Sequence, residues 1–402
     1  MTLIALLFPP LLGGCGGDPD AGLADAGPPD GQCPAPGERP GKRSEHVVVL
    51  AGDDLVIYGG TTAIPTMCDF PAPIFTDETW RYDTRCGVFS RVEAKGPGPR
   101  ARAMGAYDAA NDRVLVFGGR TRETSSGPYT LFDDLWALGA DDSWTQIEAT
   151  GPGARVAGAM GVDPTDGKVW IFGGDSSPSG TTYAPLSDTW SYDPGGGGWT
   201  QATTATTPEA RLLVGSTFDA DRRRLLVYGG VASFFATSFA DLWALDVTVP
   251  EWTRLHDGTG TAPDGRFFPS IAWEGDRTLL FGGHDATDLG NRNDLWAFDP
   301  ETNAWDELAA GDVWANDALG PCDFPPDFAT VDLTSPERRS SLGMTAGDGV
   351  MWIFGGKSDC GALDDVWSWD GTWHERTAAT AGEVCLRFFA DTPKYECAGL
   401  CL

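Results

Sequence analysis

Charged residues recur at two fixed positions along this 402-residue chain and are the first candidates for chemistry. An arginine ends each of six Pro-x-x-Arg motifs, at Arg43, Arg100, Arg155, Arg211, Arg266 and Arg339. An acid stands two positions before a tryptophan six times, at Glu78, Asp134, Asp188, Asp241, Asp294 and Asp365. Six equivalent copies favour structural roles. We predict that the arginines form a repeated salt bridge or turn bond, and that the acids bond backbone amides of the preceding turn.

The other residues with catalytic potential form no recognisable motif. The four histidines, His46, His256, His284 and His374, occupy different parts of the chain and make no His-x-x-x-His pair. The sequence also lacks a Gly-x-Ser-x-Gly nucleophile, a Cys-x-x-Cys zinc pair, and a P-loop or dinucleotide fingerprint after a strand. We therefore predict no catalytic residue, no metal ligand set and no cofactor, and leave structural calcium in the Asp-rich turns open.

The charged positions belong to a longer motif that recurs every 53 to 73 residues. An apolar stretch after each arginine ends in a glycine doublet: Gly59-Gly60, Gly118-Gly119, Gly173-Gly174, Gly229-Gly230, Gly282-Gly283 and Gly355-Gly356. The tryptophans that follow the acids are Trp80, Trp136, Trp190, Trp243, Trp296 and Trp367. A second aromatic comes six to nine residues later, at Phe89, Trp144, Trp199, Trp252, Trp305 and Trp373.

Each repeat has room for four short strands joined by polar turns. A β-branched and aromatic run precedes each doublet, the first tryptophan marks a third strand, and the second aromatic begins a fourth. Gly-Gly ends a strand where the backbone needs positive φ or approaches a neighbour closely. One such unit cannot bury its own apolar faces, so six of them predict an all-β, six-bladed β-propeller with four antiparallel strands per blade. We expect the tryptophans to fill the cores between blades, with Trp243→Ala costing about 3–5 kcal/mol.

The arginine-led inner strand, the strand that ends in Gly-Gly and the two downstream aromatics together resemble kelch repeats. The resemblance covers residues 38–378, with Phe89 in place of the second tryptophan of the first repeat. It implies blades at about 38–95, 96–150, 151–206, 207–261, 262–334 and 335–378.

The kelch resemblance also supplies an enzyme alternative. Galactose oxidase shares the propeller but needs copper ligands from Tyr and His, and no matching cluster is visible. Plant specifier proteins of this fold bind iron through a Glu/Asp/His run, which Glu274, Asp276 and His284 match only at the wrong spacing. Some bacterial periplasmic kelch proteins epimerise sialic acid with charged residues at the channel mouth. A carbohydrate epimerase or oxidase therefore remains the alternative.

Ligand contacts on a propeller are expected from loops at one mouth of the central channel. The kelch resemblance implies contacts from arginines at the start of the inner strand and just after Gly-Gly. The candidates are Arg102, Arg120, Arg122, Asp175, His284, Lys357 and Trp314. Trp314 and Phe324, in the long insertion 310–335, could contact a glycan or partner, or could cover the side of blade 5.

The first fifteen residues resemble a bacterial lipoprotein signal peptide that ends in the lipobox Leu12-Gly13-Gly14-Cys15. Cys15 would carry the lipid after cleavage. No Lys or Arg precedes the apolar segment, so either the true start lies upstream or the signal is atypical. Residues 16–37, rich in Asp, Gly and Pro, have the composition of a flexible tether.

Eight further cysteines predict disulfides in an oxidising compartment: Cys33, Cys68, Cys86, Cys322, Cys360, Cys385, Cys397 and Cys401. The connectivity is not readable from sequence, but two pairings have a geometric basis. Cys68 and Cys86 flank the third strand of the first repeat, whereas Cys322 sits in the insertion 310–335 and Cys360 just after the Gly-Gly of the sixth repeat. Cys33 would pair with the Cys-rich tail 379–402 and tie the first blade to the last.

The formal net charge of −30 makes nucleic acids and anionic membrane surfaces poor partners. The sequence therefore predicts a monomeric, extracytoplasmic propeller, held on a bacterial membrane only by its lipid. Its function would be to bind a protein or glycan ligand at the loop face.

Overall fold

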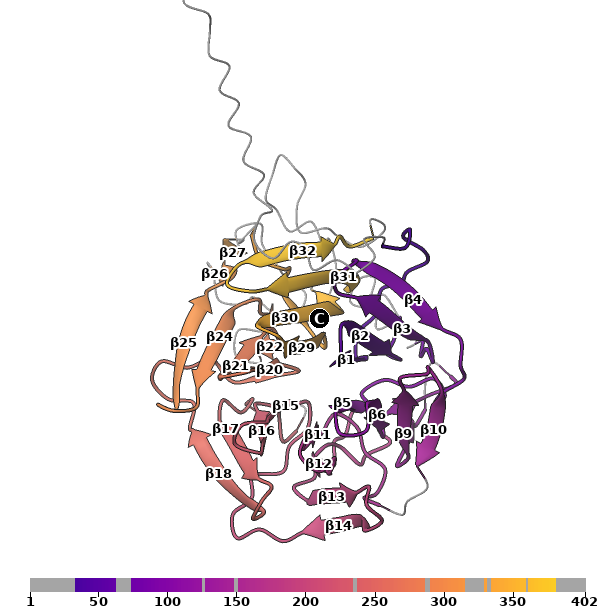
Figure 1. Ribbon diagram of the computed structural model, residues 1–402. Helices are drawn as coiled ribbons and strands as arrows, with labels where there is room; N and C mark the ends of the chain where they lie inside the picture. Colours follow the sequence, from indigo (N-terminus) through magenta and orange to yellow (C-terminus); the bar gives the residue numbers. More distant parts are fainter. Residues whose placement is uncertain are drawn as a thin grey trace, which may run out of the picture.

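The computed structural model describes residues 33–62, 74–124, 127–147, 151–233, 237–285, 290–314, 329–330, 334–358 and 361–380. Within these ranges the chain forms β-strands joined by turns, and no α-helix occurs. Six antiparallel sheets with four main strands each account for most of the described chain, and Figure 1 shows them arranged around a common centre. The expectation of an all-β fold is confirmed.

We number the sheets 1 to 6 in chain order. Sheets 1 to 3 comprise β1 (Val47–Ala51), β2 (Asp54–Tyr58), β3 (Thr79–Asp83) and β4 (Val88–Val92); β5 (Met104–Asp108), β6 (Arg113–Phe117), β9 (Leu135–Gly139) and β10 (Trp144–Ile147); and β11 (Ala159–Val162), β12 (Val169–Phe172), β13 (Thr189–Asp193) and β14 (Gly198–Ala202). Sheets 4 to 6 comprise β15 (Gly215–Asp219), β16 (Arg224–Tyr228), β17 (Leu242–Asp246) and β18 (Glu251–His256); β20 (Ser270–Glu274), β21 (Arg277–Phe281), β24 (Leu295–Asp299) and β25 (Ala304–Ala309); and β29 (Gly343–Gly347), β30 (Val350–Ser358), β31 (Gly361–Trp369) and β32 (Trp373–Thr377).

Short strands supplement the six sheets at one end of the molecule. They are β7 (Arg120–Thr121) with β8 (Thr130–Leu131), β19 (Arg266–Phe267) with β22 (His284–Asp285) and β23 (Gly290–Asn291), β26 (Val313–Trp314) with β27 (Ala329–Thr330), and β28 (Arg339–Ser340), which extends sheet 6. The innermost strands contact one another in cyclic order, β1 to β5, β11, β15, β20, β29 and back to β1. Sheet 6 therefore packs directly against sheet 1.

The repeated arginine holds each sheet together from inside. In sheet 3 the Arg155 guanidinium is 2% exposed and donates to both Asp188 carboxylate oxygens, at 2.7 and 2.9 Å, and to the Gly173 carbonyl at 3.1 Å. The indole of Trp190 donates to the same carboxylate at 2.7 Å. The acid thus accepts from a guanidinium and an indole, and not from turn amides as the sequence had led us to expect. The corresponding ion pairs are Arg43–Glu78, Arg100–Asp134, Arg211–Asp241, Arg266–Asp294 and Arg339–Asp365.

The backbone of the same arginine joins its sheet to the preceding one. The second glycine of a doublet donates its amide to the carbonyl of the next arginine, as from Gly174 to Arg211 at 2.9 Å. The bond from Gly356 to Arg43, also 2.9 Å, links the sixth sheet to the first. A Cβ on Gly173, whose φ is +66°, would lie 2.8 Å from the Arg211 carbonyl oxygen, so close approach and positive φ both require glycine.

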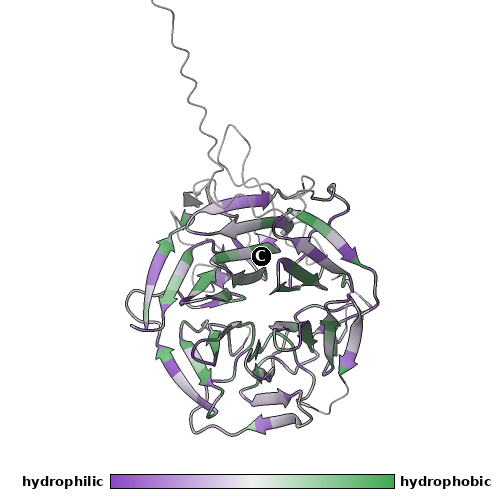
Figure 2. Cartoon of the chain, viewed as in Figure 1, coloured by the Kyte–Doolittle hydropathy of each residue, from purple (hydrophilic) through white to green (hydrophobic). Residues whose placement is uncertain are grey.

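The second aromatic of each repeat packs against the preceding sheet. Trp252 lies 4.7 Å from Phe172 between ring centroids, and its indole donates to Thr189 at 3.0 Å. Phe89 and Phe354 make the equivalent contact between sheets 1 and 6 at 6.0 Å. The inner strands are the most hydrophobic and the outer strands carry the polar residues (Figure 2). Trp243 is only partly buried at the edge of its cluster, which corrects the expectation that its ring fills a core between blades.

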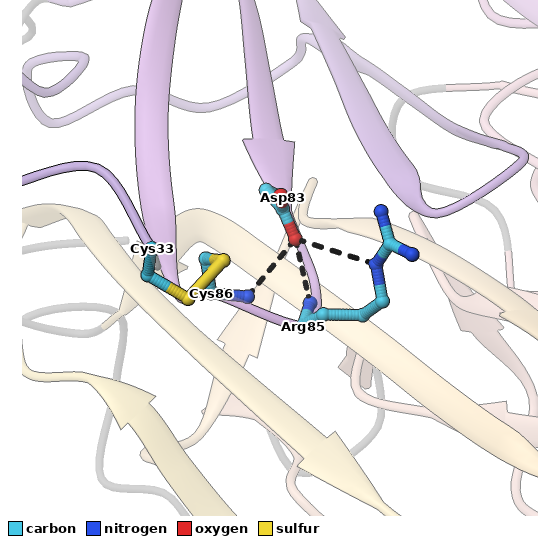
Figure 3. Close-up of a disulfide and its surroundings, with 4 residues drawn as sticks. All are labelled: Cys33, Asp83, Arg85 and Cys86. Carbon is cyan, nitrogen blue, oxygen red and sulfur yellow. Dashed lines mark hydrogen bonds and ion pairs between the residues drawn. A yellow bond between two sulfur atoms is a disulfide. The ribbon is translucent and has the colours of Figure 1, made fainter. Parts of the chain in front are cut away.

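The only disulfide among the described residues joins Cys33 to Cys86, in the turn between β3 and β4 (Figure 3). The Asp83 carboxylate accepts from the backbone amides of Arg85 and Cys86 and shapes this turn. The predicted pairings of Cys68 with Cys86 and of Cys33 with the C-terminal tail are therefore wrong. They failed because the chain before β1 begins beside the turn between β3 and β4 and then crosses to sheet 6 at Arg39. Cys68, Cys322, Cys360, Cys385, Cys397 and Cys401 lie outside the described residues.

Trp252→Ala should lower the free energy of unfolding by about 3–5 kcal/mol, because it empties a fully enclosed site between two sheets. Trp243→Ala should cost less, about 1–2 kcal/mol, because that ring is only partly buried. Denaturant titration of both variants checks the ranking. Equal losses, or a loss below about 1 kcal/mol for Trp252→Ala, would contradict this packing.

Asp188→Asn should destabilise the protein by about 3–5 kcal/mol, because it leaves the buried Arg155 charge without its counter-ion. Burial acts to raise the pKa of Asp188, but hydrogen bonds from Arg155 and Trp190 outweigh it and hold that pKa below its usual value. The difference in unfolding free energy between wild type and Asp188→Asn should be complete above about pH 4. It should shrink as the pH falls through the folded-state pKa of Asp188. Asp276→Asn, in an exposed turn, is the matched control and should change stability by less than about 0.5 kcal/mol.

Candidate functional site

A ring of residues with left-handed backbone surrounds one end of the central channel. These residues stand two positions after each repeated arginine and have φ between +52° and +59°: Glu45, Arg102, Ala157, Leu213, Phe268 and Ser341. Their backbones bond to one another across the sheets, for example from the Arg102 amide to the Glu45 carbonyl at 2.9 Å. The Glu45 amide donates to the Ser341 carbonyl at 3.0 Å and links the sixth sheet to the first. Six non-glycine residues in this conformation are strained, which is a common property of binding sites.

A second tier lies just outside this ring. It contains the residue that follows each Gly-Gly: Thr61, Arg120, Asp175, Val231, His284 and Lys357. Each pairs its backbone with the residue one position after a repeated arginine, as Arg120 does with Ala101. We call the channel end enclosed by both tiers the mouth. The opposite end, which carries the turns between the first and second and between the third and fourth strands of each sheet, is the turn face.

One half of the mouth is charged. Arg102 donates to Glu45 at 2.7 Å, and the nearest Arg120 nitrogen lies 3.9 Å from the same carboxylate. Burial acts to raise the pKa of Glu45, but the charges of Arg102 and Arg120 outweigh it and bring that pKa to about 2. Glu45 is therefore a permanent anion among more numerous cations, since Lys357 also acts on it electrostatically.

Aromatic rings cover the cations on this side. The Arg120 and Arg122 guanidinium carbons lie 4.0 and 4.4 Å from the centroid of Tyr129. Burial and the charge of Arg102 lower the pKa of Arg120, which still remains protonated at neutral pH. Stacked guanidinium groups held in place by rings are preorganised to bind an anion.

The other half of the mouth is apolar. Leu213 and Val231 form a buried cluster against which Tyr183, Phe267 and Phe268 pack. The Phe268 ring also lies 5.0 Å from the Arg102 guanidinium, so the two halves meet at this pair. The mouth therefore offers cationic and apolar surface side by side.

His284 belongs to the rim of the mouth. Its imidazole stacks on Phe267 with centroids 4.6 Å apart and an interplanar angle of 19°. Burial and then the charge of Lys357 lower its pKa to about 4. The imidazole is therefore neutral at physiological pH and contributes ring surface rather than charge.

The structure brings together most, but not all, of the residues proposed from sequence. Arg102, Arg120, Arg122, His284 and Lys357 gather at the mouth. Asp175 also belongs to the second tier, but it is fully buried and its carboxylate accepts from the amides of Ser177 and Ala184, so it organises its own loop. Trp314 contributes backbone to β26, its side chain lies outside the described set, and Phe324 falls in an undescribed stretch.

Sequence reasoning missed Glu45, Leu213 and Phe268. Their signal was positional, since they occupy the same place in the repeat as Arg102, but their residue types have nothing in common. The structure also separates the three residues that weakly matched an iron site, because Glu274 and Asp276 lie at the turn face while His284 lies at the mouth. Glu274 is instead paired with Arg277 at 2.7 Å.

Across the described ranges, no group of three or more His, Cys, Asp or Glu side chains is placed to hold a metal ion. No helix in the described chain has the length and apolar character needed to cross a membrane.

Comparison with known proteins identifies the family of this chain. The family described as the KLHDC2/KLHL20/DRC7 Kelch-repeats domain matches residues 31–211 and 164–316, which together cover more than half of the chain. The chain belongs to this kelch-repeat family. The solved structure of YjhT matches the kelch chain with a TM-score of 0.59 at 16% identity, over 84% of this chain and 98% of that chain. At that identity the match shows the propeller fold alone.

The chain is also similar to several curated proteins. Kelch domain-containing protein 10 of Homo sapiens is 28% identical over 220 residues, which cover 52% of this chain and 49% of the relative. Kelch domain-containing protein 2 of Bos taurus is 25% identical over 288 residues, 66% of this chain and 69% of the relative. N-(sulfonatooxy)prop-2-enimidothioate sulfolyase of Thlaspi arvense is 24% identical over 310 residues, 70% of this chain and 82% of the relative. The kelch chain spans about half the length of the relatives it matches first.

The two buried histidines, His46 and His284, should stay neutral well below the usual histidine pKa of about 6.5. Burial lowers the pKa of His46 to about 3 and that of His284 to about 4. As the pH falls, these histidines bind protons in the unfolded chain before they do so in the folded chain. The stability gained from keeping them neutral is therefore complete above about pH 6.5 and is lost as the pH falls towards their folded-state pKa values. Histidine NMR resonances followed against pH check this, with His284→Gln used for assignment. A His284 midpoint near 6.5 would contradict the buried, stacked ring.

Proposed function

We propose that this protein is a six-bladed kelch propeller, anchored by lipid outside the cytoplasm, whose mouth binds a protein ligand. The six sheets would be the six blades. The observation that carries the proposal is the divided mouth, in which Arg102 and Arg120 stand beside Phe268 and Leu213. Such a surface fits a ligand segment that places an anionic group next to an apolar side chain.

A peptide segment fits this mouth better than a neutral glycan. The cations there already hold one carboxylate, that of Glu45, so they are suited to a second anion from a partner. Aromatic and arginine side chains are also the residue types that carry most binding energy in protein interfaces. A glycan ligand would need its own anionic group to use the same cations.

The proposed location rests on the chemistry of the cysteines. The lipobox Leu12-Gly13-Gly14-Cys15 provides the site of lipid attachment. The disulfide between Cys33 and Cys86 requires an oxidising compartment to persist, which supports an extracytoplasmic location. The apolar cores between sheets are satisfied within one chain, which supports a monomer.

An enzyme is the second candidate function, because one relative is a sulfolyase that matches over 82% of its length. An enzyme of this kind would use the mouth cations to hold a sulfated substrate. Sulfate release from N-(sulfonatooxy)prop-2-enimidothioate tests this alternative. We expect no turnover, because the imidazole of His284 stacks on Phe267 and that of His46, which also lines this end of the channel, is bonded to the Phe354 carbonyl.

A peptide library with acidic and apolar residues should yield binders that depend on the mouth. Arg102→Met and Arg120→Met should each weaken binding of such a peptide about tenfold or more, because a charge-assisted hydrogen bond contributes about 1.5–3 kcal/mol. Arg254→Met, on the exposed outer strand β18, is the matched control and should bind as wild type does. Rising salt should weaken the wild-type complex. Equal binding by the mouth variants and the wild type would contradict the assignment.

Cys15→Ser should release the protein from the membrane fraction into the soluble fraction, because it removes the lipobox cysteine that would carry the lipid. Membrane fractionation with detection of the full chain measures this. Cys86→Ser is the control, since it changes a cysteine without touching the lipobox. A Cys15→Ser protein retained on the membrane would contradict the anchor.

A further inference from the structure

The N-terminal segment is fastened to the propeller at two points on opposite ends of one side. Cys33 is bonded to Cys86 in the turn between β3 and β4, which belongs to the turn face. Six residues later the Arg39 guanidinium donates to the carbonyls of Asp364 at 2.6 Å and of Ala378 at 3.0 Å. It also forms an ion pair with the Asp364 carboxylate at 3.1 Å.

The Arg39 contact lies towards the mouth. Asp364 precedes Asp365, whose carboxylate holds Arg339 beside the doublet of sheet 6. Ala378 follows β32, whose last residue Thr377 pairs with Val366 at the same end. Asp364 is also held by the chain that follows β32, because the Thr380 amide donates to the Asp364 carboxylate at 2.8 Å.

The segment 33–39 therefore crosses the seam between sheets 1 and 6 from the turn face to the mouth end. Six residue steps reach about 20 Å when extended, which matches the ~17 Å length of a five-residue strand. The chain then enters the mouth through the buried Arg43 and the ring residue Glu45. Cys33, the first described residue, therefore lies on the turn face.

We propose that the Cys33–Cys86 disulfide orients the anchored propeller, with the turn face towards the membrane and the mouth away from it. This inference rests on the proposed lipid at Cys15. Residues 16–32 span at most about 60 Å when fully extended. Turning the mouth to the lipid would force part of this length to run back along the side of the propeller.

Charge favours a gap between the turn face and the lipid. The turn between the first two strands of every sheet carries one exposed aspartate: Asp53, Asp112, Asp166, Asp221, Asp276 and Asp348. An anionic lipid surface repels such a face over roughly one Debye length, about 8–10 Å. Arg102 and Arg120 expose only 12% and 8% of their side chains and are paired with Glu45, so they attract that surface weakly. Charge therefore does not itself turn the mouth away from the lipid. The attachment at Cys33 does so, and it presents the mouth to a partner outside the anchoring membrane.

Energy transfer to a lipid-bound acceptor dye tests the orientation on the full-length, membrane-bound protein. A donor dye is attached through an unnatural amino acid at either Asp221 on the turn face or Thr181 in the mouth-side loop after Gly173-Gly174. Transfer from position 221 should exceed that from position 181 by roughly two-fold or more, since at least one ~17 Å strand length separates them. Equal transfer, or greater transfer from position 181, in neutral or anionic membranes overturns the proposal.

The double variant Cys33→Ser/Cys86→Ser tests the role of the disulfide. The difference between the two positions should shrink, because the chain can then leave the body nearer Arg39, at the mouth end. An undiminished difference would overturn the role assigned to the disulfide. A wild-type chain found wholly in the soluble fraction would refute the anchor and this orientation with it. Peptide binding at the mouth, measured on soluble protein, would be unaffected by that result.

Discussion

The rest of the structure depends on the ion pair and hydrogen bonds that a buried arginine makes in each repeat. Its side chain satisfies an acid and a glycine carbonyl within one sheet, and its carbonyl accepts an amide from the preceding sheet. Burying a guanidinium is costly unless every donor finds a partner, so the acid, the doublet and the tryptophan indole form one unit. The ring closes because the sixth doublet meets the first arginine in the same geometry as the other five.

The backbone geometry of the mouth follows from that unit. Once the arginine and the doublet are placed, the residue two positions on is held in the left-handed region, and the residue after the doublet lies beside it. Because these positions are held by backbone bonds, their side chains are free to differ without disturbing the scaffold. The divided character of the mouth, with Arg102 and Glu45 on one side and Leu213 on the other, depends only on those side chains.

The sequence was sufficient for the repeat and much less so for the contacts. Gly-Gly and the paired aromatics revealed the strands because their spacing repeats. A salt bridge was one of the two roles predicted for the repeated arginines, but the partner acid was not identified, because Arg155 and Asp188 are 33 residues apart and only the strand register brings them together. The ring of left-handed residues at the mouth was not predicted, because Glu, Arg, Ala, Leu, Phe and Ser share no conformational preference. Cys33 was misassigned because pairing depends on the path of a segment that carries no periodic signal.

The disulfide also determines how the protein would bear mechanical load. Each main sheet is built from one continuous stretch of chain, so sheets 6 and 1 meet through side chains and single hydrogen bonds rather than a shared strand. A pull applied on the N-terminal side of Cys33 passes through the sulfur bridge to Cys86, and the chain between the two cysteines carries no tension. The seam, with its Arg39–Asp364 clamp, is thereby shielded from peeling. Reduction of that one bond would direct the same pull onto the seam between sheets 6 and 1.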